Sequence, residues 1–112
     1  VWGSGTPRRE FLHCDDLANA VVYLMQTYES EELINIGCGQ DVSIRELAEL
    51  VASIVGFAGR LAFDATKPDG TPRKLLDVGR LAGLGWAPKI SLEKGITDTY
   101  RWLLAAQGSV RH

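Results

Sequence analysis

The sequence has little of what several classes of protein require. Its 112 residues include only two cysteines, Cys14 and Cys38, which form neither a CxxC pair nor a cluster with histidines at metal-ligand spacing. No metal site is therefore predicted, and two lone thiols suit a reducing, cytoplasmic location. No apolar run approaches the ~20 residues of a membrane span. Twelve basic residues against fourteen acidic ones leave a net charge of -2, which argues against nucleic acid or a membrane surface as a general partner.

Complete catalytic and cofactor motifs are also missing. Gly3-Ser4-Gly5 and Gly37-Cys38-Gly39 lack the spacing and the strand, turn and helix context of a dinucleotide fingerprint. None of the three tyrosines is followed four residues later by a lysine, and neither a serine nucleophile elbow nor a Walker loop occurs. The sequence therefore predicts no catalytic residue and no cofactor-binding residue within this chain.

What the sequence contains is the pattern of a small α/β protein. Hydrophobic residues make up 46% and charged residues 23%, as is typical of one globular domain. Apolar spacing predicts a helix that starts at Leu17, with Asp15 or Asp16 as its cap and dipole partner, and ends near Tyr28. His13 is expected to be a hydrogen-bonded structural histidine. The remaining expected elements are helices at 43–56, 77–81 and from 91 onward, and strands at 8–13, 33–36 and 60–63.

The second of these helices carries the clearest local signal. Ser43 is followed three residues later by Glu46, which is a capping box, and Gly56 stands where helices commonly end. Its apolar stripe is expected to be buried, and consists of Ile44, Leu47, Ala48, Val51, Ile54 and Val55. Further expectations are core positions for Trp86 and Trp102, and a frayed tail from Gln107 to His112.

Function is expected in two irregular stretches, of which the first is residues 1–16. Here Trp2 offers a flat apolar face, and Arg9 offers a planar fork for phosphate or carboxylate groups. This pairing suits a nucleotide-linked ligand. The alternative is that Trp2 packs on the surface and that Arg9 makes a solvated ion pair with Glu10 or another neighbour.

The second irregular stretch is residues 64–74. Pro68 and Pro72 exclude regular structure there and stiffen the loop. A stiff loop can present the Asp69 carboxylate to sugar or ribose hydroxyls at little ordering cost. Arg73 is a candidate binding residue on charge and proximity alone. The alternative is a solvated loop with no ligand.

Taken together, these stretches resemble the GDP-L-fucose synthase family. The Arg-x-Phe-x-His-x-x-Asp and Asn-x-Gly elements are shared among extended short-chain dehydrogenases, whereas Trp-Gly-x-Gly-Thr-Pro and Lys-Pro-Asp-Gly-Thr-Pro-Arg-Lys are more specific to this family. The resemblance extends over nearly the whole chain, and the segments that carry it are 2–7, 9–13, 15–18, 35–37 and 67–77.

The resemblance implies a multifunctional NADPH-dependent enzyme. Such an enzyme epimerises C3 and C5 of GDP-4-keto-6-deoxy-mannose and then reduces the C4 ketone. In the family, the Ser-Tyr-Lys set and the epimerising Cys and His lie N-terminal to the part resembled here. The same N-terminal part holds most of the NADPH site. Residue by residue, the resemblance implies that Trp2 and Arg9 bind the nucleotide diphosphate end of the GDP-sugar and that Asp69 binds hydroxyls.

The resemblance also implies an architecture, the C-terminal substrate-binding portion of a Rossmann-type α/β fold. Residues 1–14 would start the substrate-binding part, 15–37 would add a helix and a strand to the edge of the Rossmann domain, 38–107 would form the substrate-binding C-terminal domain, and 108–112 a tail. A helix that lacks its sheet exposes apolar surface. The chain alone is therefore expected to be marginally stable and inactive, and the complete protein to be a homodimer.

Two other interpretations stay open. One is another nucleotide-sugar epimerase or dehydratase of the same superfamily, which a comparison of GDP- with UDP-sugars would distinguish. The other is a nucleotide-binding or interaction module without chemistry of its own. An upstream glycine-rich fingerprint and Tyr-x-x-x-Lys motif would exclude that module.

Overall fold

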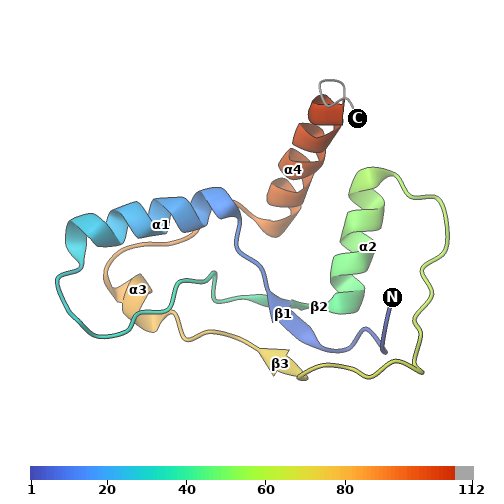
Figure 1. The fold of residues 1–112 in the computed structure, drawn as a ribbon, viewed down its shortest axis with the longest axis horizontal. Helices are drawn as coiled ribbons and strands as arrows, with labels where there is room; N and C mark the ends of the chain where they lie inside the picture. Colours follow the sequence, from blue (N-terminus) through green and yellow to red (C-terminus); the bar gives the residue numbers. More distant parts are fainter. Residues whose placement is uncertain (108–112) are drawn as a thin grey trace.

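The computed structural model describes residues 1–107 as a small three-stranded sheet with helices attached at its ends (Figure 1). The sheet has the strand order β2-β1-β3, with β1 antiparallel to β2 and parallel to β3. The elements are β1 (Arg8–Glu10), α1 (Cys14–Thr27), β2 (Asp41–Ser43), α2 (Ile44–Val55), β3 (Arg73–Lys74), α3 (Gly79–Gly83) and α4 (Leu92–Gln107).

Helix α1 begins three residues earlier than expected, and its cap is a different residue. His13 is the N-cap, since its imidazole Nδ1 accepts a hydrogen bond from the Asp15 amide at 3.0 Å. The expectation of an aspartate cap was wrong, although Asp15 and Asp16 do lie in the first turn beside the positive end of the helix dipole. Asp16 is buried, and its carboxylate accepts the amides of Lys89 and Ile90, so that it joins α1 to the segment before α4.

Helix α2 confirms the local prediction at both of its ends. The Ser43 hydroxyl accepts the Glu46 amide at 3.1 Å and donates to the Glu46 carboxylate at 3.1 Å. Gly56 ends the helix in the left-handed conformation at φ 73°, which favours glycine. The predicted burial of its apolar stripe was wrong. Val51 and Val55 are more than a third exposed, because the described chain supplies only α4 as a helix packed against α2.

The capping box gives a first testable prediction. Replacement of Ser43 by alanine removes the side-chain acceptor of the Glu46 amide, and N-cap losses of this kind cost about 1 kcal/mol of unfolding free energy. Urea denaturation of Ser43→Ala measures this loss. Ser53→Ala, at an exposed position of the same helix, is the matched control and should be neutral or slightly stabilising. Equal effects of the two changes would contradict the prediction.

The strands differ most from expectation. The first is shorter than 8–13, and β2 and β3 were not predicted; Arg73 and Lys74 are paired even though they directly follow Pro72. Residues 33–36 and 60–63 form no strand. No strand pairs with 33–36 within residues 1–107, and the Leu33 carbonyl instead accepts a hydrogen bond from Arg80 at 2.9 Å. The place of residues 33–36 in a larger sheet stays a prediction.

The hydrophobic core is very small. Ala20, Leu81 and Trp86 are the buried apolar side chains of the described part, and partly buried residues from α1 and the 33–36 segment pack around them. The expected core position of Trp86 is thus confirmed, whereas Trp102 is 69% exposed on α4 and was wrongly placed. The radius of gyration is 17.1 Å, above the ~13 Å of a compact domain of this length.

Apolar surface lies open on several helices. On α1, the outward residues Leu17, Val21 and Met25 are exposed, as expected for a helix without a covering sheet. No helix of residues 1–107 is long and apolar enough to cross a membrane. The tail was predicted to fray from Gln107 to His112. Gln107 is the last residue of α4, and residues 108–112 lie outside the described residues.

Candidate functional site

The two irregular stretches that were expected to carry function lie side by side. The Gly3 amide donates to the Asp64 carbonyl at 2.9 Å, and the Asp64 amide donates to the Val1 carbonyl at 2.7 Å. Further along, the Arg8 amide donates to the Pro72 carbonyl at 2.9 Å. Residues 1–9 and 64–74 therefore lie next to each other, with Trp2 and Asp69 on adjacent loops and Arg9 on β1.

Trp2 presents its indole ring to solvent. The residue is 75% exposed although its backbone is fixed by a parallel bridge to Asp64. The Lys67 ammonium lies 5.0 Å from the centre of the ring, within the range of a cation–π interaction. A fixed, exposed aromatic ring with a cation beside it can stack on a base or a sugar and attract a phosphate.

Arg9 is held by two carbonyl groups and by no carboxylate. Its Nη1 donates to the carbonyls of Arg8 at 2.7 Å and Thr71 at 2.6 Å. Within residues 1–107 no acidic side chain lies at ion-pair distance from it, so the predicted alternative of a pair with Glu10 was wrong. Nε and Nη2 have no acceptor there, and these three N–H groups remain available for an anion.

An open cavity adjoins Arg9 at the end of β1. It has a volume of about 510 Å³, and its lining includes Phe11, Cys38, Asp41, Pro88 and Lys89. Pockets of a few hundred cubic ångströms with mixed apolar and polar lining are the usual sites of small ligands, so the surface around Arg9 has room for one.

Asp69 connects its own loop to the turn that carries Trp2. Its two carboxylate oxygens accept the Ser4 amide at 2.8 Å and the Ser4 hydroxyl at 2.7 Å. These two hydrogen bonds, that of the hydroxyl first, lower the pKa of Asp69, so the group stays charged. A carboxylate has about four lone pairs, and two remain for hydroxyl groups of a ligand. Sequence reasoning missed Ser4, because nothing local marks it as a partner of a residue 65 positions away.

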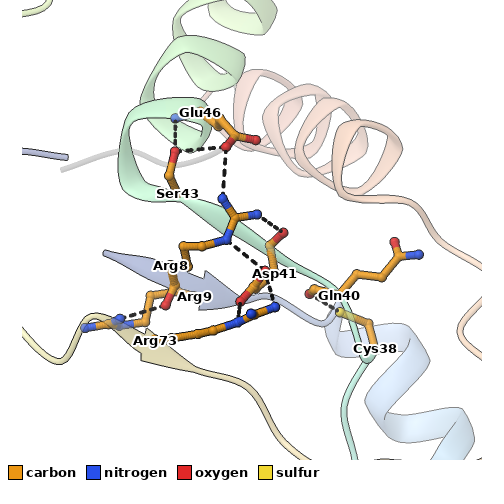
Figure 2. Close-up of polar contacts among 8 residues, drawn as sticks. All are labelled: Arg8, Arg9, Cys38, Gln40, Asp41, Ser43, Glu46 and Arg73. Atoms are coloured by element: carbon orange, nitrogen blue, oxygen red, sulfur yellow. Dashed lines mark hydrogen bonds and ion pairs between the residues drawn. The ribbon is translucent and has the colours of Figure 1, made fainter. Parts of the chain in front are cut away.

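Arg73 differs from Arg9 because its charge is compensated. Its Nε donates to Asp41 at 2.7 Å, and Arg8 donates to the other oxygen of the same carboxylate at 3.0 Å (Figure 2). The Asp41 side chain is only 4% exposed. Burial alone would raise the pKa of Asp41, but the hydrogen bonds and charges of Arg73 and Arg8 together lower it. A contact of Arg73 with substrate stays a prediction.

Both glycine turns already hold carboxylates of the chain itself. The amides of Cys38 and Gly39 donate to Oε1 of Glu10, and the Ser4 amide donates to Asp69. The turn at 37–39 leads into β2 and not into a helix. A pyrophosphate needs free amides at a helix N-terminus, so neither turn fits NADPH.

One cluster of metal-ligand types occurs within residues 1–107, at the start of α1. One ligand atom each of His13, Cys14 and Asp15 lies within 4.8 Å of the others. The histidine atom nearest the other two is Nδ1, which already accepts the Asp15 amide as the helix cap. The geometry is that of an N-cap and supports no metal site.

Comparison with known proteins shows which enzymes the chain resembles. Residues 1–37 match the model of the NAD dependent epimerase/dehydratase family. Across 104 residues the chain is 62% identical to GDP-L-fucose synthase 1 of Arabidopsis thaliana, an alignment that covers 93% of this chain and 32% of the relative. Over residues 1–37 the chain is therefore similar to the NAD dependent epimerase/dehydratase family. It is also 53% identical to the GDP-L-fucose synthase of Escherichia coli K12, over 99% of this chain and 37% of that protein.

The fold is that of a part of these epimerase-family enzymes. A crystal structure of a GDP-L-fucose synthetase from Naegleria fowleri bound to NADP superimposes with a TM-score of 0.91 at 30% identity, covering all of this chain and 36% of that one. The expected fold class, an α/β portion of a Rossmann-type enzyme, is thereby confirmed. The chain spans about a third of the length of the family members it matches.

Proposed function

We propose that this chain is the GDP-sugar-binding C-terminal part of a GDP-L-fucose synthase. The complete enzyme would epimerise GDP-4-keto-6-deoxy-mannose at C3 and C5 and reduce its C4 ketone with NADPH. Support comes from the high identity to GDP-L-fucose synthases of plants and bacteria and from a site that suits a nucleotide diphosphate. Another nucleotide-sugar epimerase or a module without chemistry is not favoured by this similarity.

The observation that carries the proposal is the uncompensated charge of Arg9. Three basic residues meet at the start of the sheet, and two of them, Arg8 and Arg73, form ion pairs with Asp41, with Glu46 as a second partner of Arg8. Arg9 retains its charge and three free donors, and Trp2 on the adjoining loop presents an exposed ring. In the proposed complex, Arg9 holds the diphosphate, Trp2 lies against the nucleotide end, and Asp69 accepts hydrogen bonds from hydroxyl groups.

We assign no catalytic group to this chain. NADPH supplies the hydride for the ketone, and we assign its binding to the part that precedes residue 1, because neither glycine turn here fits it. The work of residues 1–14 and 38–107 is to bind and orient the GDP-sugar, and 15–37 would complete the edge of the nucleotide-binding sheet. Alone, this chain should be inactive.

The deciding experiment is an activity assay of the complete protein. With NADPH and GDP-4-keto-6-deoxy-mannose, we expect GDP-L-fucose as product and oxidation of one NADPH per sugar. The matched UDP-sugar should give no turnover. Turnover of UDP-sugars alone would place the protein with another epimerase, and binding of GDP without oxidation of NADPH would indicate a non-catalytic module. The proposal includes a cytoplasmic homodimer, which light scattering and cell fractionation can test.

A further inference from the structure

The Asp41 carboxylate links all three strands of the sheet. It belongs to β2, accepts from Arg8 of β1 at 3.0 Å and accepts from Arg73 of β3 at 2.7 Å (Figure 2). Arg8 also donates to the Asp41 carbonyl at 3.2 Å, and its Nη1 lies 3.4 Å from the exposed carboxylate of Glu46. Asp41 is the shielded member of this group, because its side chain is 4% exposed.

Strand β3 depends on this carboxylate. The strand consists of two exposed residues, and Arg73 pairs directly with Arg8 of the parallel neighbour. Like charges at paired positions of adjacent strands repel each other. Asp41 converts this repulsion into two ion pairs, and thereby keeps the short strand that ends the 64–74 loop attached to β1.

The same attachment fixes Arg9. Its guanidinium is oriented by the Thr71 carbonyl at 2.6 Å, two residues before Arg73. Gly70 lets the loop backbone approach, since a Cβ at this position would lie 2.9 Å from Nη2. If β3 separates from β1, the Thr71 carbonyl moves away and Arg9 loses the contact that directs its free donors.

We propose that Asp41 is a positioning residue for nucleotide-sugar binding, which acts through β3 and Thr71 on the orientation of Arg9. This inference rests on the function proposed above. Asp41 also lines the cavity beside Arg9, but its side chain is only 4% exposed and is paired with Arg8 and Arg73, so its role in this proposal is positioning and not contact with the ligand. The lowered pKa of Asp41 agrees with a carboxylate that stays charged at neutral pH.

The test is Asp41→Asn in the complete protein, with Glu46→Gln as the matched control. Glutamine preserves the capping box and removes only the negative charge of the exposed partner of Arg8. For Asp41→Asn we expect the KM for the GDP-sugar and the Kd for GDP to rise by between about ten- and a hundredfold, as for misplaced binding groups. The kcat and the KM for NADPH should be unchanged, and the control should change neither.

A double variant separates positioning from general destabilisation. If Asp41 acts through Arg9, Asp41→Asn should cost less than about twofold in GDP affinity when Arg9 is already alanine. An equal cost in both backgrounds would overturn the inference. Should Asp41→Asn not fold, Asp41→Glu retains the charge with a displaced carboxylate and should still weaken binding severalfold.

The outcomes also distinguish the two levels of the proposal. If Arg9→Ala weakens GDP binding and the two Asp41 substitutions leave it unchanged, the positioning role is wrong while the proposed function stands. If Arg9→Ala has no effect either, the proposed diphosphate contact itself is wrong. If binding weakens only together with NADPH affinity and thermal stability, Asp41 is a structural residue and the inference fails.

Discussion

Replacement of Arg9 by alanine should weaken GDP binding about ten- to a hundredfold while the fold survives. A hydrogen bond from a charged donor to phosphate contributes ~1.5–3 kcal/mol, which corresponds to this loss of affinity. The side chain contributes little to the fold, because its only partners in the described chain are the carbonyls of Arg8 and Thr71. Calorimetry with GDP on the complete protein measures the affinity directly.

The matched control is Arg101→Ala. Arg101 is an exposed arginine on α4 without an ion pair in the described chain, so its removal subtracts the same charge from a distant surface. The control should bind GDP within about twofold of the unchanged protein, since exposed charges far apart are screened. If both variants lose affinity equally, the effect is one of net charge, and the assignments of Trp2 and Asp69 weaken with that of Arg9.

Salt dependence provides a second measurement on the same pair of proteins. A direct contact between Arg9 and a phosphate should make GDP affinity fall as ionic strength rises, because salt screens the interaction. Arg9→Ala should reduce this dependence, whereas Arg101→Ala should leave it unchanged. A salt dependence that survives in Arg9→Ala would assign the phosphate contact to another cation, such as Lys67.

Local signals predicted the helices well because the groups concerned are close in sequence. The Ser43 to Glu46 capping box and the Gly56 end of α2 are interactions within one helix, so three or four residues suffice to determine them. The start of α1 illustrates the limit. Two aspartates were better cap candidates than His13, but Asp16 faces the amides of Lys89 and Ile90 and is not free to cap.

The sheet was predicted poorly because strand pairing is not local. Strands β2 and β3 have three and two residues, and each exists only because β1 lies beside it. Such short segments carry almost no periodicity of their own. In the same way, the apolar stripe of α2 was correctly found but incorrectly expected to be buried, since its burial depends on partners that residues 1–107 do not contain.

The candidate site shows the same division between local and distant information. Sequence indicated that residues 1–16 and 64–74 both matter, and the structure places them in contact. Sequence ranked Arg9 above Arg73 as a binding residue, but it could not show that the charge of Arg73 is paired within the protein. The two arginines differ because Arg73 is paired with Asp41, which lies 32 positions away in the sequence. No local sequence feature marks Asp41 as that partner.

Substitution of Gly37 by alanine should lower the free energy of unfolding by ~3 kcal/mol or more. A Cβ at this position would overlap Oε1 of Glu10. Glu10 would then have to leave the amides of Cys38, Gly39 and Leu76, to which its carboxylate is bonded. Hydrogen bonds to a charged group contribute ~1.5–3 kcal/mol each. Urea denaturation of the complete protein measures the loss.

Gly83→Ala is the matched control, because a Cβ there meets no atom within 4 Å and alanine favours helix. It should be neutral or stabilise the protein by up to about 1 kcal/mol. Glu10→Ala provides the second comparison. If the clash with the carboxylate is the cause, Gly37→Ala should add little to Glu10→Ala, since the group that it displaces is already gone. Additive losses would instead place the cost of Gly37→Ala in the backbone of the turn, independent of Glu10.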